Sequence, residues 1–174
     1  MFREERDQSQ FEWKDLGDIT VGRPNLGPTT SVAVYRLMQY TMRDVLIKDY
    51  GVERADALLF EAGKVAGKAL CRNLLDTKLE PEAFISDLSE KLIGLSVGVL
   101  RVETADLDKM EFILTVAEDL DCSGLPVSDE TVCNYDEGFI AGILEEFSGI
   151  EFNVREVDCW ASGERICRFE ARAA

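Results

Sequence analysis

The chain has 174 residues, of which 46% are hydrophobic and 30% charged, and its formal net charge is −15. This is the composition of one ordinary globular domain, and so acidic a chain lacks the basic face that nucleic acid or an anionic membrane surface requires. No apolar run approaches the roughly 20 residues of a membrane helix, and the polar N-terminus MFREERDQSQFEWKD lacks the apolar core of a secretory signal. We therefore expect a cytoplasmic protein without nucleic-acid or membrane partners, in which the five cysteines are thiols rather than disulfides.

Helices are predicted before strands along the chain. Residues 1–27 are predicted to be an N-terminal extension, and residues 28–174 a single domain. Apolar residues at helical spacing, with glycine or proline at the ends, predict helices over about residues 29–50, 53–75, 81–92 and 135–147. Strands are predicted in SVGVLRVET, KMEFILTVAE, EFNVREVDCW and RICRFEAR. Without alternation of strand and helix, this order favours an α+β fold with helices packed on a mostly antiparallel sheet.

The second predicted helix carries a stripe of small residues, Ala62, Gly63, Ala66 and Gly67. Small side chains let another backbone or a ligand come close. Glycine costs roughly 1 kcal/mol in a helix interior, and tight helix packing is the usual reason to keep it. Helix packing and a ligand contact both remain open for this stripe.

Two cysteines flank the last predicted turn, in the stretch EVDCWASGERIC. If residues 162–164 form a three-residue loop, Cys159 stands opposite Cys167, and both thiols point to one face of the hairpin. Glu156 lies three residues before Cys159 and falls on the other face of a regular strand. It joins the two thiols only if the strand bends or bulges.

A metal site can be assembled around this hairpin although the chain has no histidine. Cys133 lies near the N-terminus of the last helix, where the helix dipole favours a thiolate. Zinc takes sulfur and carboxylate ligands in a tetrahedron, so Cys133, Glu156, Cys159 and Cys167 would fill a closed, structural site. Two alternatives remain: Cys122 replaces Glu156 in a four-cysteine site that would also suit iron–sulfur, or the cysteines are small buried residues.

These features resemble the 4-vinyl reductase (4VR) domains. The run TVCNYDEGFIAGILEEFSGIEFNVREVDCWASGERICRFEA is similar to the C-terminal half of that family. The upstream stretches GRPNLGPTTSVAVYRLMQYT and EDLDCSGLP are also similar, so the resemblance extends from about Leu26 onward. It implies the ligand-binding fold of the NO-signalling and Golgi-transport type, shared by phenol-sensing regulators and TRAPP-type vesicle-tethering subunits. It also implies a homodimer formed through helices.

The phenol sensors imply a function as well as a fold. The matching residues there bind one zinc, which implies the ligands Cys133, Glu156, Cys159 and Cys167 here, with a bent strand at Glu156. The sensors also place a histidine in their pocket, which this chain lacks. We expect a standalone, sensor-like domain that binds an apolar or aromatic small molecule and carries a structural zinc.

A ligand pocket is predicted between the helices and the sheet. Its candidate lining residues are Tyr35, Met38, Phe60, Gly63, Gly67, Phe112, Phe139 and Ile143. The family name implies an alternative, a reductase or accessory subunit in tetrapyrrole (chlorophyll-type) metabolism, but the chain has no G-x-G-x-x-G loop after a strand and no histidine for a catalytic triad. An enzyme is therefore the less favoured expectation, and a scaffold subunit without ligand is a further alternative. The sequence names neither the ligand nor the metal, zinc or iron.

Overall fold

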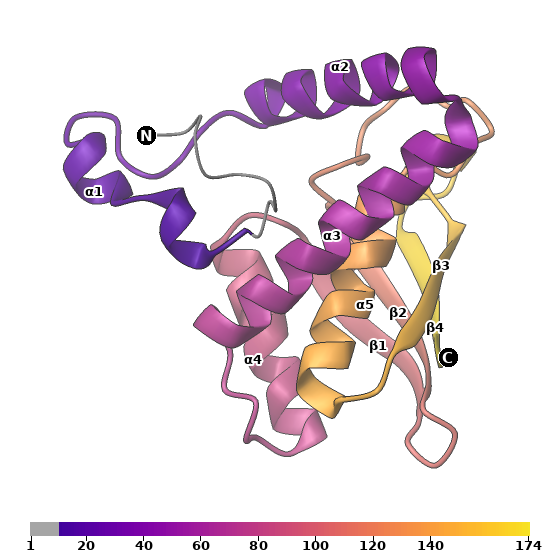
Figure 1. The fold of residues 1–174 in the computed structure, drawn as a ribbon. Helices are drawn as coiled ribbons and strands as arrows, with labels where there is room; N and C mark the ends of the chain where they lie inside the picture. The colour runs from indigo at the N-terminus through magenta and orange to yellow at the C-terminus, as the bar shows by residue number, and fades with distance from the viewer. Residues whose placement is uncertain (1–10) are drawn as a thin grey trace.

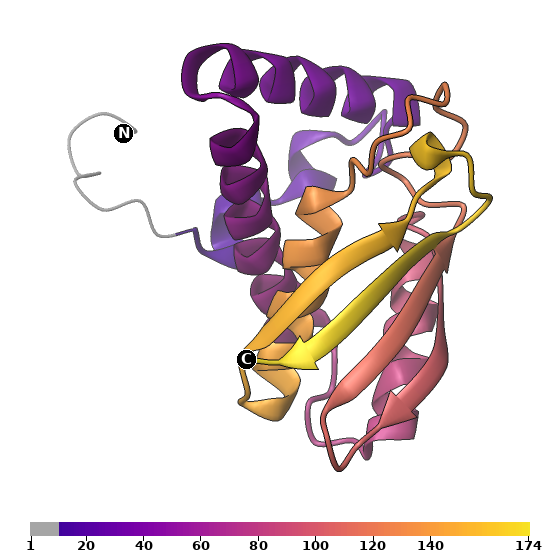
Figure 2. The same cartoon turned by 90° about the vertical axis from the view of Figure 1, so that its right-hand side faces the viewer.

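The protein is described here by a computed structural model that covers residues 11–174. Helices gather on one side of a four-stranded antiparallel sheet, as the two perpendicular views show (Figure 1, Figure 2). The helix layer and the sheet enclose the hydrophobic core between them. The predicted α+β class is confirmed.

The helices begin and end at local sequence signals. They are α1 (Ile19–Gly22), α2 (Val32–Tyr50), α3 (Val52–Leu74), α4 (Pro81–Gly94) and α5 (Asn134–Ser148). Ser31 caps α2 by accepting a hydrogen bond from the backbone of Ala33. Gly51, with φ of +82°, ends α2 and leads directly into α3, and Gly149 ends α5 in the left-handed conformation. The four predicted helices are confirmed, with small shifts at their ends.

The strands form a sheet of order β1-β2-β4-β3. They are β1 (Val99–Asp106), β2 (Glu111–Ala117), β3 (Phe152–Asp158) and β4 (Cys167–Ala173). The last strand therefore lies inside the sheet, where Cys167 pairs with Val116 of β2. Along β3, Phe152, Val154 and Glu156 are buried and alternate with exposed residues.

A bulge interrupts β3 near its end. Glu156 pairs with Phe169 of β4 and Asp158 pairs with Arg168, so Val157 is an extra residue in the ladder. The bend that the sequence predicted at Glu156 is confirmed. It turns the chain after Glu156 so that the next residues leave the plane of the sheet.

The predicted three-residue hairpin loop is wrong, and so is the direct pairing of Cys159 with Cys167. Residues 159–166 form a longer connection that includes the 3-10 turn Trp160–Ser162. The cause is local: the Ser162 hydroxyl accepts from the backbone N–H of Cys159 at 3.1 Å and donates to its carbonyl at 2.8 Å. Such bonds compete with the hydrogen bonds of a strand ladder.

Helices α3 and α5 touch backbone to backbone (Figure 1). A methyl group added at Gly63 would lie 1.9 Å from the carbonyl oxygen of Tyr135, and one added at Gly138 would lie 1.9 Å from that of Phe60. The same close approach occurs at Gly67 and Gly142. Of the two interpretations of the small-residue stripe, the structure shows helix packing at these positions.

The described part of the N-terminal extension lies beside the helices (Figure 1). Trp13 packs against the core, whereas Val21 and Leu26 are each 76% exposed. The boundary between residues 27 and 28 stays a prediction. None of the helices within residues 11–174 is long and apolar enough to cross a membrane.

Candidate functional site

Four cysteines from four separate segments meet at one end of the sheet. Cys122 lies in the loop after β2, Cys133 is the N-cap of α5, Cys159 follows β3, and Cys167 begins β4. Each is at most 1% exposed, and their sulfur atoms all lie within 4.8 Å of one another. The fold therefore assembles a compact, buried group of four thiols.

The sulfur spacing suits a tetrahedral metal. The Sγ–Sγ distance is 3.0 Å for Cys122–Cys167, 3.8 Å for Cys133–Cys159 and 4.0 Å for Cys133–Cys167. A metal bound by four sulfurs at about 2.3 Å would place them about 3.8 Å apart. Hydrogen bonds from the other three thiols lower the pKa of Cys159, which favours the thiolate that binds metal. The donor set thus fits zinc or another thiolate-binding ion.

Glu156 lies beside this group. It is 3% exposed, and its Oε2 accepts a hydrogen bond from the backbone N–H of Cys133 at 3.1 Å. Its other carboxyl oxygen is buried and finds no partner within residues 11–174. Burial, assisted by the charge of Cys159, raises the pKa of Glu156 to about 8. All five candidate ligands are therefore neighbours, and the predicted set of three cysteines and Glu156 stays a prediction.

Side chains of α2 hold the loop that carries Cys122. The Tyr35 hydroxyl donates to the carboxylate of Asp121 at 2.8 Å, and the Tyr40 hydroxyl donates to its backbone carbonyl at 2.9 Å. The Arg36 guanidinium donates to three backbone carbonyls of the same loop. One face of α2 is therefore devoted to positioning this loop.

Two apolar spaces lie between the sheet and helices α4 and α5. An open pocket of about 620 Å³ is formed by the start of α4, the β1–β2 hairpin and the end of α5. An enclosed cavity of about 30 Å³ lies deeper in the same layer, large enough for a water molecule. Ile85, Leu114 and Leu144 line both, so a single layer of side chains separates them.

The predicted pocket residues have different surroundings. Phe112 lines the open pocket, and Phe139 and Ile143 line the enclosed cavity. Tyr35 bonds to the cysteine loop, and Met38 is 62% exposed on α2. The remaining three belong to the α3–α5 contact: Phe60, Gly63 and Gly67.

Two carboxyl groups at the enclosed cavity escaped the sequence reasoning. Asp119 and Asp136 both line it, and Asp119 is 3% exposed. Burial raises the pKa of each, and the Asp119 charge raises that of Asp136 further. The only sequence signal was an acidic residue in the first turn of α5, which is ordinary because the helix dipole favours it there.

Residues 112–173 match the family model of the vinyl-4-reductase (4VR) domain. This segment runs from β2 to β4 and contains the four clustered cysteines. The chain thus contains a 4VR domain, and the resemblance to 4-vinyl reductase domains is confirmed over that segment.

Two curated proteins of Methanocaldococcus jannaschii are similar to most of the chain, and both are described as uncharacterized. MJ0150 is 25% identical over 156 residues, which cover 90% of this chain and 85% of that protein. MJ1642 is 26% identical over 147 residues, which cover 84% and 80%.

Solved structures share the fold. The phenol-responsive sensory domain of the transcription activator PoxR, determined with phenol, has a TM-score of 0.66 at 17% identity over 83% of this chain and 75% of that one. A vinyl-4-reductase family protein from Methanocaldococcus jannaschii has a TM-score of 0.59 at 19% identity, covering 85% and 84%. A trafficking protein particle complex subunit 3 from Naegleria fowleri, covalently bound to palmitic acid, has a TM-score of 0.61 at 15% identity, covering 82% and 95%. The predicted relation to sensory and TRAPP-type folds is confirmed.

Proposed function

We propose that this chain, with its 4VR domain, is a sensor-like protein that binds an apolar or aromatic small molecule between its helices and its sheet. The observation that carries the proposal is the open pocket of about 620 Å³. Ligand sites commonly enclose about 300–1,000 Å³ and are lined mainly by apolar side chains. The phenol-bound sensory domain of similar fold supports this use of the architecture.

Aromatic rings form much of the pocket wall. Phe84 of α4 stacks on Phe147 of α5 with ring centroids 3.9 Å apart. Phe112 of β2 and Phe152 of β3 lie with ring centroids 5.9 Å apart and tilted planes. All four rings line the open pocket. Rigid apolar surfaces of this kind bind aliphatic and aromatic groups with little loss of side-chain entropy.

We propose a structural zinc at the four cysteines, with Cys122 in the position that the resemblance gives to Glu156. The support is the mutual distance of the four sulfurs, which matches a tetrahedral thiolate site. A site closed by four protein ligands leaves no position for water, so the metal would fix the surrounding segments rather than catalyse a reaction. Unpaired thiols of this kind suit the cytoplasm that the sequence predicts.

We also propose that the protein forms a homodimer through the outer face of α2. Leu37 is 67% exposed, Met38 62% and Val45 51%, and they lie on the side of the helix away from the cysteine loop. Apolar side chains exposed in a row on one helix mark a surface that is buried in an assembly. Packing α2 against α2 of a second copy would cover both stripes.

Native mass spectrometry of protein purified without added metal or chelator tests these proposals together. We expect a dimer with one zinc per chain and an additional organic mass. Ala105→Trp, which places an indole ring at the exposed wall of the pocket, should remove the organic mass and keep the zinc. Ala57→Trp, at an exposed position of α3, is the matched control and should keep both.

The competing functions give different results in the same experiments. A scaffold subunit would carry no organic mass and bind no compound of an apolar and aromatic panel in calorimetry, which contradicts the binding proposal. A reductase or accessory subunit would show turnover of a vinyl tetrapyrrole that depends on added reductant. An iron–sulfur mass in place of zinc would overturn the structural zinc.

A further inference from the structure

Two aspartates close one end of a cavity that is otherwise apolar. Asp119 comes from the loop after β2, and Asp136 comes from the first turn of α5. A carboxyl oxygen of each lies within 4.8 Å of the other. The rest of the wall is aliphatic and aromatic, and it includes Leu88, Leu92, Val97, Leu100, Val116 and Ile140.

These carboxyl groups lack a cationic partner within residues 11–174. Asp119 accepts hydrogen bonds only through Oδ1, from the backbone N–H groups of Asp121 and Cys122 at 2.8 and 3.1 Å. In the described part of the chain, Asp136 Oδ2 is buried without a hydrogen-bond partner, and neither aspartate forms an ion pair. A buried polar group left without a partner is unfavourable by about 1–3 kcal/mol, and a donor from outside the chain relieves it.

The cavity and the open pocket lie along one line. Leu144 lines both spaces and stands eight positions after Asp136 on α5, which corresponds to about 12 Å along the helix axis. Rotation of Leu144 and Ile85 would join the two spaces. A ligand that enters from the open pocket therefore needs an elongated apolar body to bring its polar end to the aspartates.

We propose that the ligand is an elongated apolar amine whose ammonium group is bound by Asp119 and Asp136. The inference rests on the proposed function and specifies the ligand class of the same pocket. An ammonium group offers three donors and a positive charge to two acidic side chains. A hydroxyl group offers one donor and no charge, and a carboxylate would be repelled by both aspartates and would leave Asp136 without a donor.

Isothermal titration calorimetry with octylamine, octanol and octanoate tests this, because the three probes share one apolar chain and differ in the head group. The metal-loaded protein at neutral pH should bind octylamine about tenfold or more tightly than octanol, and octanoate weakest of all. Asp136→Asn should weaken octylamine binding by about tenfold and leave octanol binding nearly unchanged. The metal content and melting temperature of this variant should match those of the wild type.

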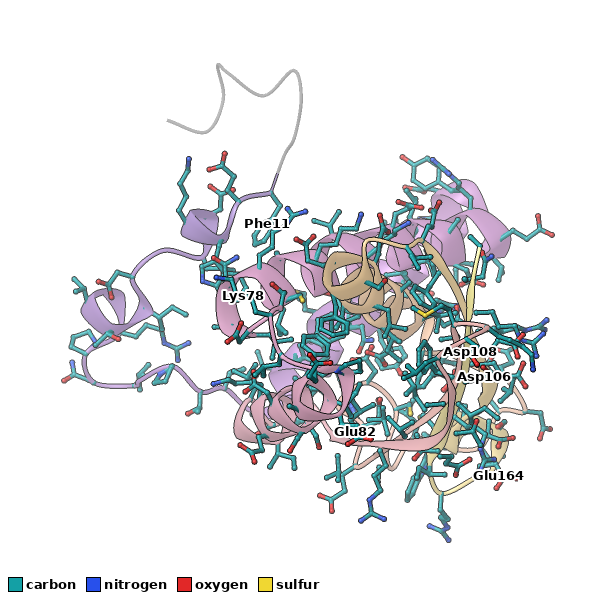
Figure 3. All side chains as sticks on the ribbon, turned by 90° about the horizontal axis from the view of Figure 1, so that it is seen from below. Phe11, Lys78, Glu82, Asp106, Asp108 and Glu164 are labelled. Atoms are coloured by element: carbon teal, nitrogen blue, oxygen red, sulfur yellow. The ribbon has the colours of Figure 1, made fainter. Side chains whose placement is uncertain are left out.

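Glu82→Gln is the control at the other end of the ligand path. Glu82 is the acidic residue that lines the open pocket, on the face shown in Figure 3. Its replacement should leave the order of the three probes unchanged. If Glu82→Gln rather than Asp136→Asn removes the preference for the amine, the head group lies at the mouth and the inference is overturned.

Two further outcomes separate this inference from the proposed function. Octanol or octanoate binding as tightly as octylamine overturns the amine while leaving a ligand-binding domain in place. If none of the three probes binds, the amine is overturned and the proposed function itself fails its first direct test.

Discussion

Replacing Gly63 by alanine should separate α3 from α5. The added methyl group would lie 1.9 Å from the Tyr135 carbonyl oxygen, whereas real Cβ atoms essentially never come closer than 3.0 Å to such an atom. The two helices must therefore move apart by about 1.1 Å, the difference between these distances. Backbone opposes backbone here, so no side-chain rotation relieves the clash.

The magnitude follows from the loss of packing. A gap of this size forfeits about a quarter to a half of each dispersion contact, and inserting extra methyl groups into a packed core costs about 1–3 kcal/mol or more. Since alanine recovers up to about 1 kcal/mol through its higher helix propensity, the net loss should be about 2–3 kcal/mol. For a chain of this size, the melting temperature should fall by about 4–12 °C.

Gly94→Ala is the matched control. Gly94 is the exposed last residue of α4, and a methyl group there would meet no atom within 4 Å among residues 11–174. It should stabilise the protein by about 0.4–1 kcal/mol, because alanine lowers the entropy of the unfolded chain. Thermal unfolding followed by circular dichroism should thus give shifts of opposite sign for the two variants. A Gly63→Ala protein as stable as the wild type would refute the backbone contact between α3 and α5.

Three other predictions address the metal, the assembly and the pH dependence. Cys122→Ser should lose most of its zinc and melt at lower temperature, because structural zinc contributes to folding, whereas Glu156→Gln should keep its zinc; elemental analysis showing the reverse restores Glu156 as the fourth ligand. Leu37→Glu places a charge on the exposed face of α2 and should give a monomer in light scattering; a monomeric wild type contradicts the homodimer. Lys68, which donates to Glu145 at 2.6 Å, lowers the pKa of that carboxyl below its usual value. The resulting stability is present above the usual pKa and is lost as pH falls through the lowered one, so in acid titrations monitored by unfolding, Glu145→Gln should lose part of the stability difference between neutral and acidic pH; an unchanged difference would show that the pair contributes nothing.

Helix positions followed from sequence because the signals are local. Gly51 and Gly149 end α2 and α5 where their conformations require a residue without a side chain. The partner of the small-residue stripe on α3 was less evident, although α5 repeats the same four-residue spacing in Gly138 and Gly142. Matching spacings on two helices predict a close contact only when their pairing in space is known.

The cysteine site was predicted in part for a similar reason. The sequence singled out Cys133, Cys159 and Cys167, and the structure brings these three sulfurs together. The position of Cys122 depends on side chains such as Tyr35 and Arg36, which lie more than 80 residues earlier in the chain. No local periodicity encodes contacts over such a separation, so the loop after β2 could not be placed from sequence.

The metal centre and the ligand cavity share that loop. Asp119 faces the cavity, and its carboxylate also accepts the backbone N–H of Cys122 at 3.1 Å. A metal bound to Cys122 would therefore fix one wall of the cavity as well as the end of the sheet. Arg36 of α2 holds the same segment through its carbonyl groups, and the opposite face of α2 is exposed and apolar. Metal, cavity wall and proposed dimer face are thus joined through one short segment, in which each contact limits the freedom of the next.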